Sequence, residues 1–327
     1  MAGAAALAIL FLSVYEVRAQ QQVPAAPAQA EPSAPEAPAT PAPSAPVFPK
    51  VDPADFTAAT PSKDLINSFL QTSWGYDPDR VWQIQGIRKT AVDGLSKVII
   101  VIGDRSGKQK LMALQFFALP DGKHIIAGDD VLPFGSDPYA DYRALLQQKA
   151  DGPYRGAPAK DLELVEFADF QCPHCKEAQA IMDKLVVDYP KARIIYQDYP
   201  LEKIHPQSFN ASAYGTCVAK LGGSSAFFAY AQAVFDGQEG LLNADGATLT
   251  LNSAVAKAGL EPAKVAACAV TPEVKARVEA SAQLAQTINV NQTPTLMVNG
   301  RQVPLGGMPY ETLKKIIDYQ MKLDGIK

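Results

Sequence analysis

Two cysteines three residues apart, in Cys172-Pro173-His174-Cys175, are the residues whose types and spacing are most able to do chemistry. They follow a strongly apolar run, 162–167, and precede a segment whose apolar residues repeat at helical spacing. The unpaired N–H groups and positive partial charge of a helix N-terminus favour a thiolate. Proline is tolerated in the first helical turn, and His174 can add positive charge or a hydrogen bond beside the sulfur. The pattern predicts a redox-active pair in which the sulfur of Cys172 is exposed and exchanges partners.

A Cys-x-x-Cys motif is also half of a common zinc site. Zinc typically takes four ligands, often from a second cysteine pair, but Cys217 and Cys268 lie far apart in the sequence. His124 falls in another predicted domain, and His205 stands alone. A purely structural disulfide is the other alternative, and so small a ring at a helix start is poor geometry for one. Redox exchange is therefore favoured, and no metal is expected.

The elements around the motif must place these cysteines at one end of a sheet. The pattern predicts strand, helix, strand, a helical insertion, two strands and a last helix. The expected ranges are 162–167, a helix that includes 178–186, then 192–197, about 206–288, 295–298, 302–305 and 309–322. The first strand, helix and strand imply a parallel pair with a right-handed crossover.

In three places this part of the chain resembles the thioredoxin-fold thiol-disulfide oxidoreductases of the DsbA type. These are Glu166-Phe167, the run from Phe170 to Cys175, and Thr293-Pro294. The helical insertion between the two halves of the fold is also similar. The resemblance covers about residues 160–327 and implies an α/β, thioredoxin-like fold with a helical insertion.

The resemblance also implies a role for each matching residue. In that family the cysteine at the position of Cys172 is attacked or attacks, and the one at Cys175 resolves the mixed disulfide. The proline matching Pro294 is cis and packs against the disulfide, whereas the residue before it, here Thr293, offers backbone hydrogen bonds to an extended substrate. The acidic residue matching Glu166 is a buried proton acceptor and donor.

Simpler interpretations of these residues remain open. Pro294 could be an ordinary proline at the start of a strand, and Glu166 could be an edge-strand carboxylate that faces water. His205 is more simply structural than catalytic.

The two remaining cysteines, Cys217 and Cys268, make the cysteine count even. If Cys172 and Cys175 pair, only one further pairing remains. In an exported protein we expect a structural disulfide across the helical insertion, as in some relatives of the resembled family. Two buried thiols are the alternative.

The pattern of residues 59–150, in the middle of the chain, predicts a small α+β domain. Ser62 can cap a short helix, three strand-like runs follow, and Asp121-Gly122 predicts a hairpin. A Gly- and Pro-containing stretch, 151–160, is the expected linker to the next domain. The run from Pro120 to Gly128 is weakly similar to the dimerisation domain of the DsbC/DsbG isomerases, which implies a possible homodimer through residues 59–150.

The N-terminus predicts export. An apolar stretch, 4–14, is too short to span a bilayer comfortably but suits a signal peptide over 1–19. No Lys or Arg precedes it, so an uncleaved membrane anchor and an ordinary apolar helix remain alternatives. Between Gln20 and Lys50 stand nine prolines and nine alanines, so 20–58 is expected to be a disordered linker. The expected location is the periplasm or another extracytoplasmic face.

Composition excludes other classes of function. The 327 residues carry a net charge of −4, which argues against a general nucleic-acid binder. No apolar run reaches 18 residues, so a polytopic membrane protein is excluded.

The sequence therefore predicts an exported enzyme that oxidises substrate thiols. It needs no cofactor beyond the Cys172–Cys175 disulfide. Its expected partners are unfolded or cysteine-containing exported proteins and a membrane or soluble redox partner. Two signals on the direction of electron flow disagree. Pro173-His174 between the cysteines resembles the motif of strongly oxidising family members, whereas Thr293 before the proline resembles the residue found in the disulfide isomerases. A disulfide isomerase or reductase with a chaperone-like N-terminal domain, and a non-enzymatic soft-metal-binding or chaperone protein, are the alternatives.

Overall fold

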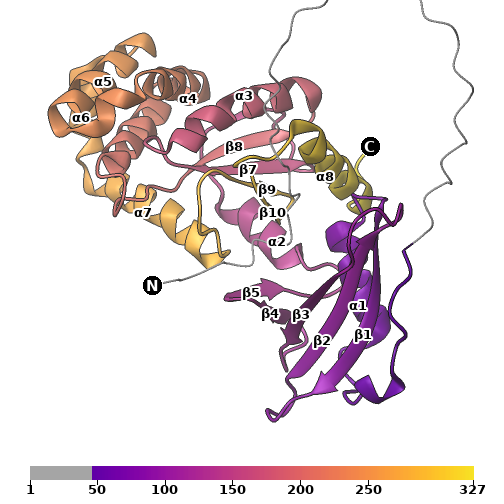
Figure 1. Cartoon of the computed structure of the whole chain (residues 1–327). Coiled ribbons are helices and arrows are strands. Elements are labelled where there is room, and N and C mark those ends of the chain that lie inside the picture. The colour runs from indigo at the N-terminus through magenta and orange to yellow at the C-terminus, as the bar shows by residue number, and fades with distance from the viewer. Residues whose placement is uncertain (1–45) are drawn as a thin grey trace, which may run out of the picture. The chain divides into compact units, whose positions relative to one another are not determined.

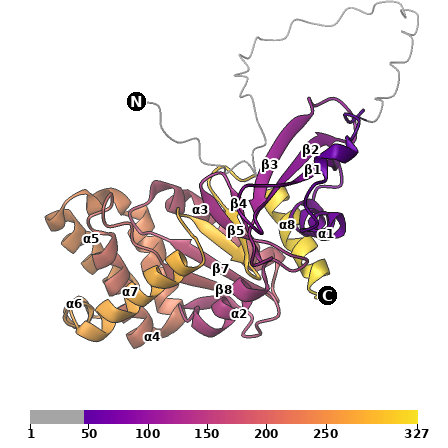
Figure 2. The same ribbon diagram turned by 90° about the horizontal axis from the view of Figure 1, so that it is seen from below.

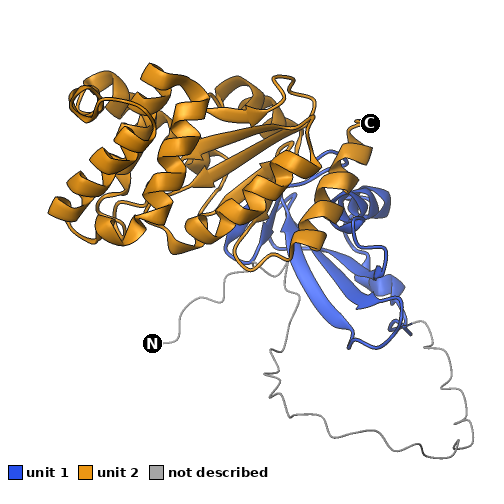
Figure 3. Ribbon diagram, turned by 90° about the horizontal axis from the view of Figure 1, so that it is seen from above, with its two compact units in different colours: residues 1–138 blue, residues 139–327 orange. Residues whose placement is uncertain are grey.

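The protein is described by a computed structural model that covers residues 46–327. It forms two compact units, one ending at Pro138 and the other running from Tyr139 to Lys327 (Figure 3). The predicted signal peptide, 1–19, and most of the predicted linker lie outside the described residues. Within 46–327, no helix combines the length and apolarity that a membrane crossing requires.

The first unit is an antiparallel sheet packed against one helix, the small α+β domain that was predicted. Its strands follow chain order: β1 (Arg80–Lys89), β2 (Ser96–Asp104), β3 (Met112–Ala118), β4 (His124–Ala127) and β5 (Asp130–Pro133). Helix α1 (Lys63–Trp74) begins after Ser62, whose hydroxyl accepts the N–H of Leu65 at 3.1 Å. Ile66, Phe69 and Leu70 then face the core of the sheet.

The first unit begins before the predicted linker ends. The linker was expected to reach residue 58, but the short 3-10 helix η2 (Pro53–Asp55) and the residues after it bind to β1. Asp55 forms an ion pair with Arg88 at 2.7 Å, and the N–H of Ala58 donates to the carbonyl of Ile87 at 3.0 Å. Phe56, a large apolar residue after the Pro/Ala tract, packs partly buried against the core, so composition alone set the boundary too late.

The boundary between the units also differs from the expected one, which was 151–160. Helix α2 (Ala140–Lys149) belongs to the second unit, and β6 (Tyr154–Gly156) is an edge strand of its sheet. The glycines that suggested a linker are needed for close packing. A Cβ on Gly152 would overlap the carbonyl oxygen of Tyr196, and Gly156 has φ of 85°.

The second unit is built on a five-stranded sheet in the order β10-β9-β7-β8-β6. Its strands after β6 are β7 (Glu163–Ala168), β8 (Arg193–Asp198), β9 (Thr295–Val298) and β10 (Arg301–Pro304). The central pair, β7 and β8, is parallel, and helix α3 (Pro173–Asp188) connects them. The last helix, α8 (Tyr310–Leu323), contacts α3 through hydrogen bonds, such as Tyr189 to Asp318 at 2.8 Å. The predicted thioredoxin-like fold class is confirmed.

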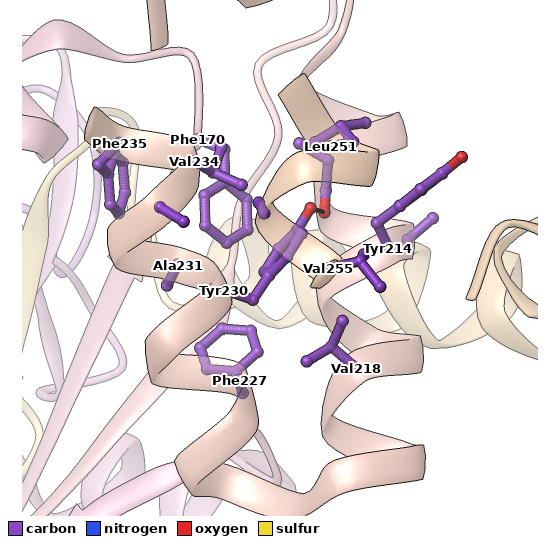
Figure 4. Close-up of a cluster of buried hydrophobic side chains, with 14 of the residues drawn as sticks. Phe170, Tyr214, Val218, Phe227, Tyr230, Ala231, Val234, Phe235, Leu251 and Val255 are labelled. Carbon is purple, nitrogen blue, oxygen red and sulfur yellow. Dashed lines mark hydrogen bonds between the residues drawn. The ribbon is translucent and has the colours of Figure 1, made fainter. Parts of the chain in front are cut away.

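A helical insertion separates β8 from β9 and lies at the opposite end of this unit from α8 (Figures 1 and 2). Its elements are α4 (Ser208–Asp236), the 3-10 helix η3 (Gln238–Leu242), α5 (Ala244–Lys257), α6 (Pro262–Ala269) and α7 (Pro272–Thr287). An aromatic cluster joins the insertion to the sheet. Phe170, just after β7, stacks on Tyr196 of β8 with ring centroids 5.2 Å apart. Its ring also contacts three aromatic rings of α4, those of Phe227, Tyr230 and Phe235 (Figure 4).

Candidate active site

The two motif cysteines stand at the start of α3, next to the C-terminal end of the central strand β7. Cys172 is the N-cap residue, with φ of −71° and ψ of 120°, and Pro173 takes the first helical position. The carbonyl of Cys172 accepts the N–H groups of Cys175 at 3.1 Å and of Lys176 at 3.3 Å. This geometry also brings the N–H groups of His174 and Cys175 to the sulfur of Cys172.

The two thiols differ strongly in acidity. A hydrogen bond from the thiol of Cys175 is the main cause that lowers the pKa of Cys172 to about 5, and the Thr293 hydroxyl and the N–H groups of Cys175 and His174 add to it. Burial raises the pKa of Cys175 well above that of an ordinary thiol. At neutral pH the reduced pair is therefore a thiolate at Cys172 and a thiol at Cys175.

Cys172 is less accessible than the sequence suggested. Only 5% of its surface is exposed, whereas Cys175 is completely buried. Pro173 and His174, which follow Cys172, are exposed. Burial of the Cys172 thiol opposes the hydrogen bonds that lower its pKa, but the hydrogen bonds have the larger effect.

The loop before β9 lies against the motif. The Thr293–Pro294 peptide bond is cis, and the sulfur of Cys172 lies 3.5 Å from the carbonyl oxygen of Thr293. The hydroxyl oxygen of Thr293 is buried and has no other partner within the described residues, so it can donate to the Cys172 thiolate. The structure therefore brings together Cys172 and Thr293, which are 121 residues apart in the sequence.

Glu166 is buried inside the sheet and does not face water. It lies on the central strand β7, 2% exposed, so the edge-strand alternative is wrong. Burial raises its pKa to about 7, and it in turn raises the pKa of Cys175 through its negative charge. Gln179, which the sequence did not single out, donates its amide to the Glu166 carboxylate and to the Cys175 carbonyl, each at 3.1 Å. Glu166 can therefore bind or release a proton near neutral pH, close enough to the Cys175 thiol to affect its pKa.

His174 was expected to add positive charge or a hydrogen bond beside the sulfur, and it interacts with Cys172 in both ways, although its ring pairs with another residue. Its side chain is 65% exposed and pairs with Glu177 at 3.0 Å, an interaction that raises the pKa of His174. The backbone N–H of His174 bonds the sulfur of Cys172 and helps to lower its pKa.

The other histidine of this unit, His205, lies close to the motif but does not touch a sulfur. Its ring bonds the buried carboxylate of Asp169 at 2.9 Å, and the same carboxylate accepts the N–H of Leu201 at 2.7 Å. The backbone N–H of Asp169 donates to the sulfur of Cys175 at 3.4 Å. Asp169 was overlooked in the sequence, and it makes His205 a structural support for the β7–α3 loop.

The remaining cysteines form a disulfide across the insertion. Cys217 of α4 and Cys268 of α6 are joined, with Cα atoms 6.0 Å apart, which is the pairing expected from the sequence. Cys172 and Cys175 are free thiols in this structure. Within residues 46–327, no three His, Cys, Asp or Glu side chains are grouped so that they could hold a metal ion.

A family model and several known proteins are similar to part of this chain. A family model described as Thioredoxin matches residues 148–319. A thioredoxin-like oxidoreductase from Silicibacter pomeroyi is similar at 26% identity, over 55% of this chain and 98% of that one, with a TM-score of 0.47. The catalytic domain of ScsC from Proteus mirabilis is similar at 22% identity over 55% and 98%, with a TM-score of 0.46. The thiol-disulfide exchange protein alpha-DsbA2 from Wolbachia pipientis is similar at 20% identity over 55% and 96%, with a TM-score of 0.47.

Part of this chain is also similar to proteins that are named as antiporters. A Na(+)/H(+) antiporter, NhaA 1 of Mycolicibacterium vanbaalenii, is 30% identical over 147 residues, which are 45% of this chain and 23% of the antiporter. NhaA 3 of Salinispora tropica is 28% identical over 148 residues, again 45% of this chain and 22% of the antiporter. The chain thus spans less than a quarter of the length of these relatives.

Proposed function

We propose that this chain, which belongs to the thioredoxin family, is a DsbA-type thiol-disulfide oxidoreductase that is exported and oxidises the thiols of other exported proteins. The observation that carries this proposal is the difference between the two motif thiols. A thiolate that is favoured at Cys172 stabilises the reduced pair, which makes the disulfide a stronger oxidant. The raised pKa of Cys175 keeps the second sulfur protonated after it has left.

The reaction begins with the oxidised enzyme, in which Cys172 and Cys175 share a disulfide. A substrate thiolate attacks the sulfur of Cys172, the Cys172–Cys175 bond breaks, and a bond forms between the substrate and Cys172. Cys175 leaves as a thiolate and takes a proton from Glu166, and the raised pKa of Glu166 supports this step. A second substrate thiolate then attacks the substrate sulfur, and Cys172 leaves as the favoured thiolate. The substrate loses two electrons and forms a disulfide, while the enzyme gains them as a dithiol.

The site also has groups that can hold the substrate backbone. Thr293 lies against Cys172, and the carbonyl of this residue is directed to the sulfur at which the substrate arrives. An extended segment beside the thiol can pair with the backbone of this loop. The substrate class is therefore an unfolded or extended polypeptide that contains cysteine.

A redox partner, in the membrane or in solution, must take the two electrons and restore the disulfide. Isomerisation would use the same nucleophile but start from reduced Cys172. A homodimer through residues 59–150 would favour the isomerase, or a chaperone that grips unfolded chains. Nucleic acid is not among the proposed partners.

A trapping experiment tests the proposal. In Cys175→Ala the resolving sulfur is absent, so mixed disulfides between Cys172 and exported proteins should accumulate under oxidising conditions. The matched control is Cys172→Ala/Cys175→Ala, which should trap nothing. If the single variant captures no more protein than the double variant, the proposed exchange is wrong.

The reduction potential of the wild-type pair decides the direction. A strongly oxidising value supports the oxidase, whereas a value near that of thioredoxin, about −270 mV, contradicts it and favours a reductase. Binding of stoichiometric Cu(I) without turnover of a reduced protein substrate would favour the soft-metal alternative instead.

A further inference from the structure

Two glutamine side chains connect the helical insertion to the loop that carries the reactive thiol. Gln171, directly before Cys172, donates its amide to the carbonyl of Leu241 in η3 at 2.9 Å. In the opposite direction Gln238, the first residue of η3, donates to the carbonyl of Phe170 at 2.8 Å and to that of Cys172 at 2.9 Å. The exchange reaction described above uses neither glutamine.

We propose that Gln238 is a positioning residue for the Cys172 thiol: its side-chain amide fixes the backbone on both sides of Gln171 and ties the reactive cysteine to the helical insertion. The inference rests on the proposed thiol-disulfide exchange and deepens it. It gives the insertion a part in the chemistry of the thiol.

The contacts of Cys172 show why this amide matters for the sulfur. The carbonyl of Cys172 receives the N–H groups of Cys175 and Lys176, which begin α3, and Gln238 adds a third donor. These three donors hold Cys172 in the extended conformation that leaves its sulfur in front of the first helical turn. In this position the sulfur receives the N–H groups of His174 and Cys175.

The insertion also holds the residue two positions before Cys172. The ring of Phe170 lies among the aromatic side chains of α4, with its centroid 5.3 Å from that of Phe235 (Figure 4). Phe235 stands three residues before Gln238 in the sequence. The ring packing anchors the loop, and the Gln238 amide sets the orientation of its carbonyl groups. Removing the amide should therefore disturb the thiol more than the fold.

The test compares Gln238→Ala and Gln238→Met with the wild type by titrating the absorbance of the Cys172 thiolate near 240 nm. Gln238→Met keeps most of the length of the side chain and removes the donor. We expect each variant to raise the pKa of Cys172 by about half a unit to one unit, because a backbone that is no longer fixed weakens the hydrogen bonds that the thiolate receives. One unit is a tenfold loss of thiolate preference and makes the disulfide less oxidising by about 30 mV.

A glutamine elsewhere in the insertion provides the matched control. Gln232 is exposed on α4 and donates only to Asp236 at 2.8 Å, so Gln232→Ala should leave the pKa of Cys172 unchanged. Gln238→Glu keeps the shape of the side chain but places an acceptor against two carbonyl oxygens, and it should raise the pKa of Cys172 at least as much as Gln238→Ala.

The outcomes separate this inference from the proposed function. If wild-type Cys172 titrates like an ordinary thiol and traps no substrate, the proposed function fails. If the wild type has the low pKa but all three Gln238 variants share it, the positioning role is overturned. This holds even when urea denaturation shows that the variants are less stable, because Gln238 would then be only a structural tie.

Discussion

The sulfur of Cys172 lies 3.5 Å from the backbone carbonyl oxygen of Thr293, although 121 residues separate the two in the sequence. β7 and β9 are antiparallel neighbours in the sheet, so the residues that follow the end of β7 lie near those that precede the start of β9. Thr293 presents two groups to the sulfur. Its carbonyl accepts from the protonated thiol, whereas its otherwise unpartnered hydroxyl can donate to the thiolate. Deprotonation of Cys172 therefore changes which of the two groups it bonds.

Removing the Thr293 hydroxyl should make the thiolate form of Cys172 less stable. Thr293→Val keeps the shape of the side chain and the backbone carbonyl, and we expect the pKa of Cys172 to rise by about half a unit to one unit. Absorbance near 240 nm as a function of pH measures it. Thr287→Val is the control, because the Thr287 hydroxyl donates to Gln283 in an exposed part of α7. Equal pKa values in both variants would show that the hydroxyl does not reach the sulfur.

Glu166 should set the pH dependence of exchange. Burial holds its pKa at about 7, so it is half protonated near neutrality and can supply a proton to Cys175 as that sulfur leaves. Glu166→Gln should slow reduction of the disulfide about 100-fold and remove the step near pH 7 from the rate profile. Glu163→Gln changes another buried carboxylate of β7 and should keep both the rate and the step. A step that persists in Glu166→Gln would assign it to another group.

Much of this site could be predicted because its signals are local. The proline after Cys172 and the apolar spacing up to Val186 indicate a helix that begins at the motif, and α3 has that start. The pairing of the His174 ring with Glu177 could not be predicted, because it depends on the orientation of both side chains on the helix.

The supporting glutamines could not be found from the sequence. Gln179 and Gln238 are ordinary polar residues on or beside helices, and nothing in their spacing marks them. Their roles arise only because α3 lies on β7 and because η3 returns to the motif loop. Asp169 has the same origin: its partner His205 becomes its neighbour only after β8 is paired with β7.

The stability of the oxidised protein should fall as the pH rises through neutrality. Burial raises the pKa of Glu166 and that of Asp198 to about 7, from ordinary values of 4.5 and 3.8. Between about pH 4 and pH 7 the folded protein binds more protons than the unfolded chain. The free energy of unfolding therefore decreases as the pH rises through this window. Glu166 contributes about 3 kcal/mol to this loss and Asp198 about 4 kcal/mol.

The measurement is urea denaturation of the disulfide form at pH 4 to 8, in which Cys172 and Cys175 do not titrate. Asp198→Asn in a Glu166→Gln background should flatten the profile. A slope as steep as that of the wild type would mean that both carboxyls ionise normally in the folded state.

The Cys217–Cys268 disulfide should stabilise the protein without tuning the active site. It closes a loop between residues 51 apart, and the chain-entropy estimate for such a loop is about 4 kcal/mol. Cys217→Ala/Cys268→Ala should lower the free energy of unfolding by roughly this amount and leave the pKa of Cys172 unchanged. Denaturation in a Cys172→Ser/Cys175→Ser background avoids disulfide exchange. A loss below about 1 kcal/mol would show that the bridge does not constrain the insertion.

Gly152 tests where the second unit begins. A linker glycine tolerates alanine, but a Cβ at Gly152 would overlap the carbonyl oxygen of Tyr196 on β8. Gly152→Ala should therefore lower the free energy of unfolding by about 1 to 3 kcal/mol, the usual cost of overpacking. Gly306→Ala is the control, because a Cβ there meets no atom within 4 Å and needs no positive φ. An equal effect of the two substitutions would mean that the segment around β6 does not pack on β8, and the sequence-based boundary at 151–160 would stand.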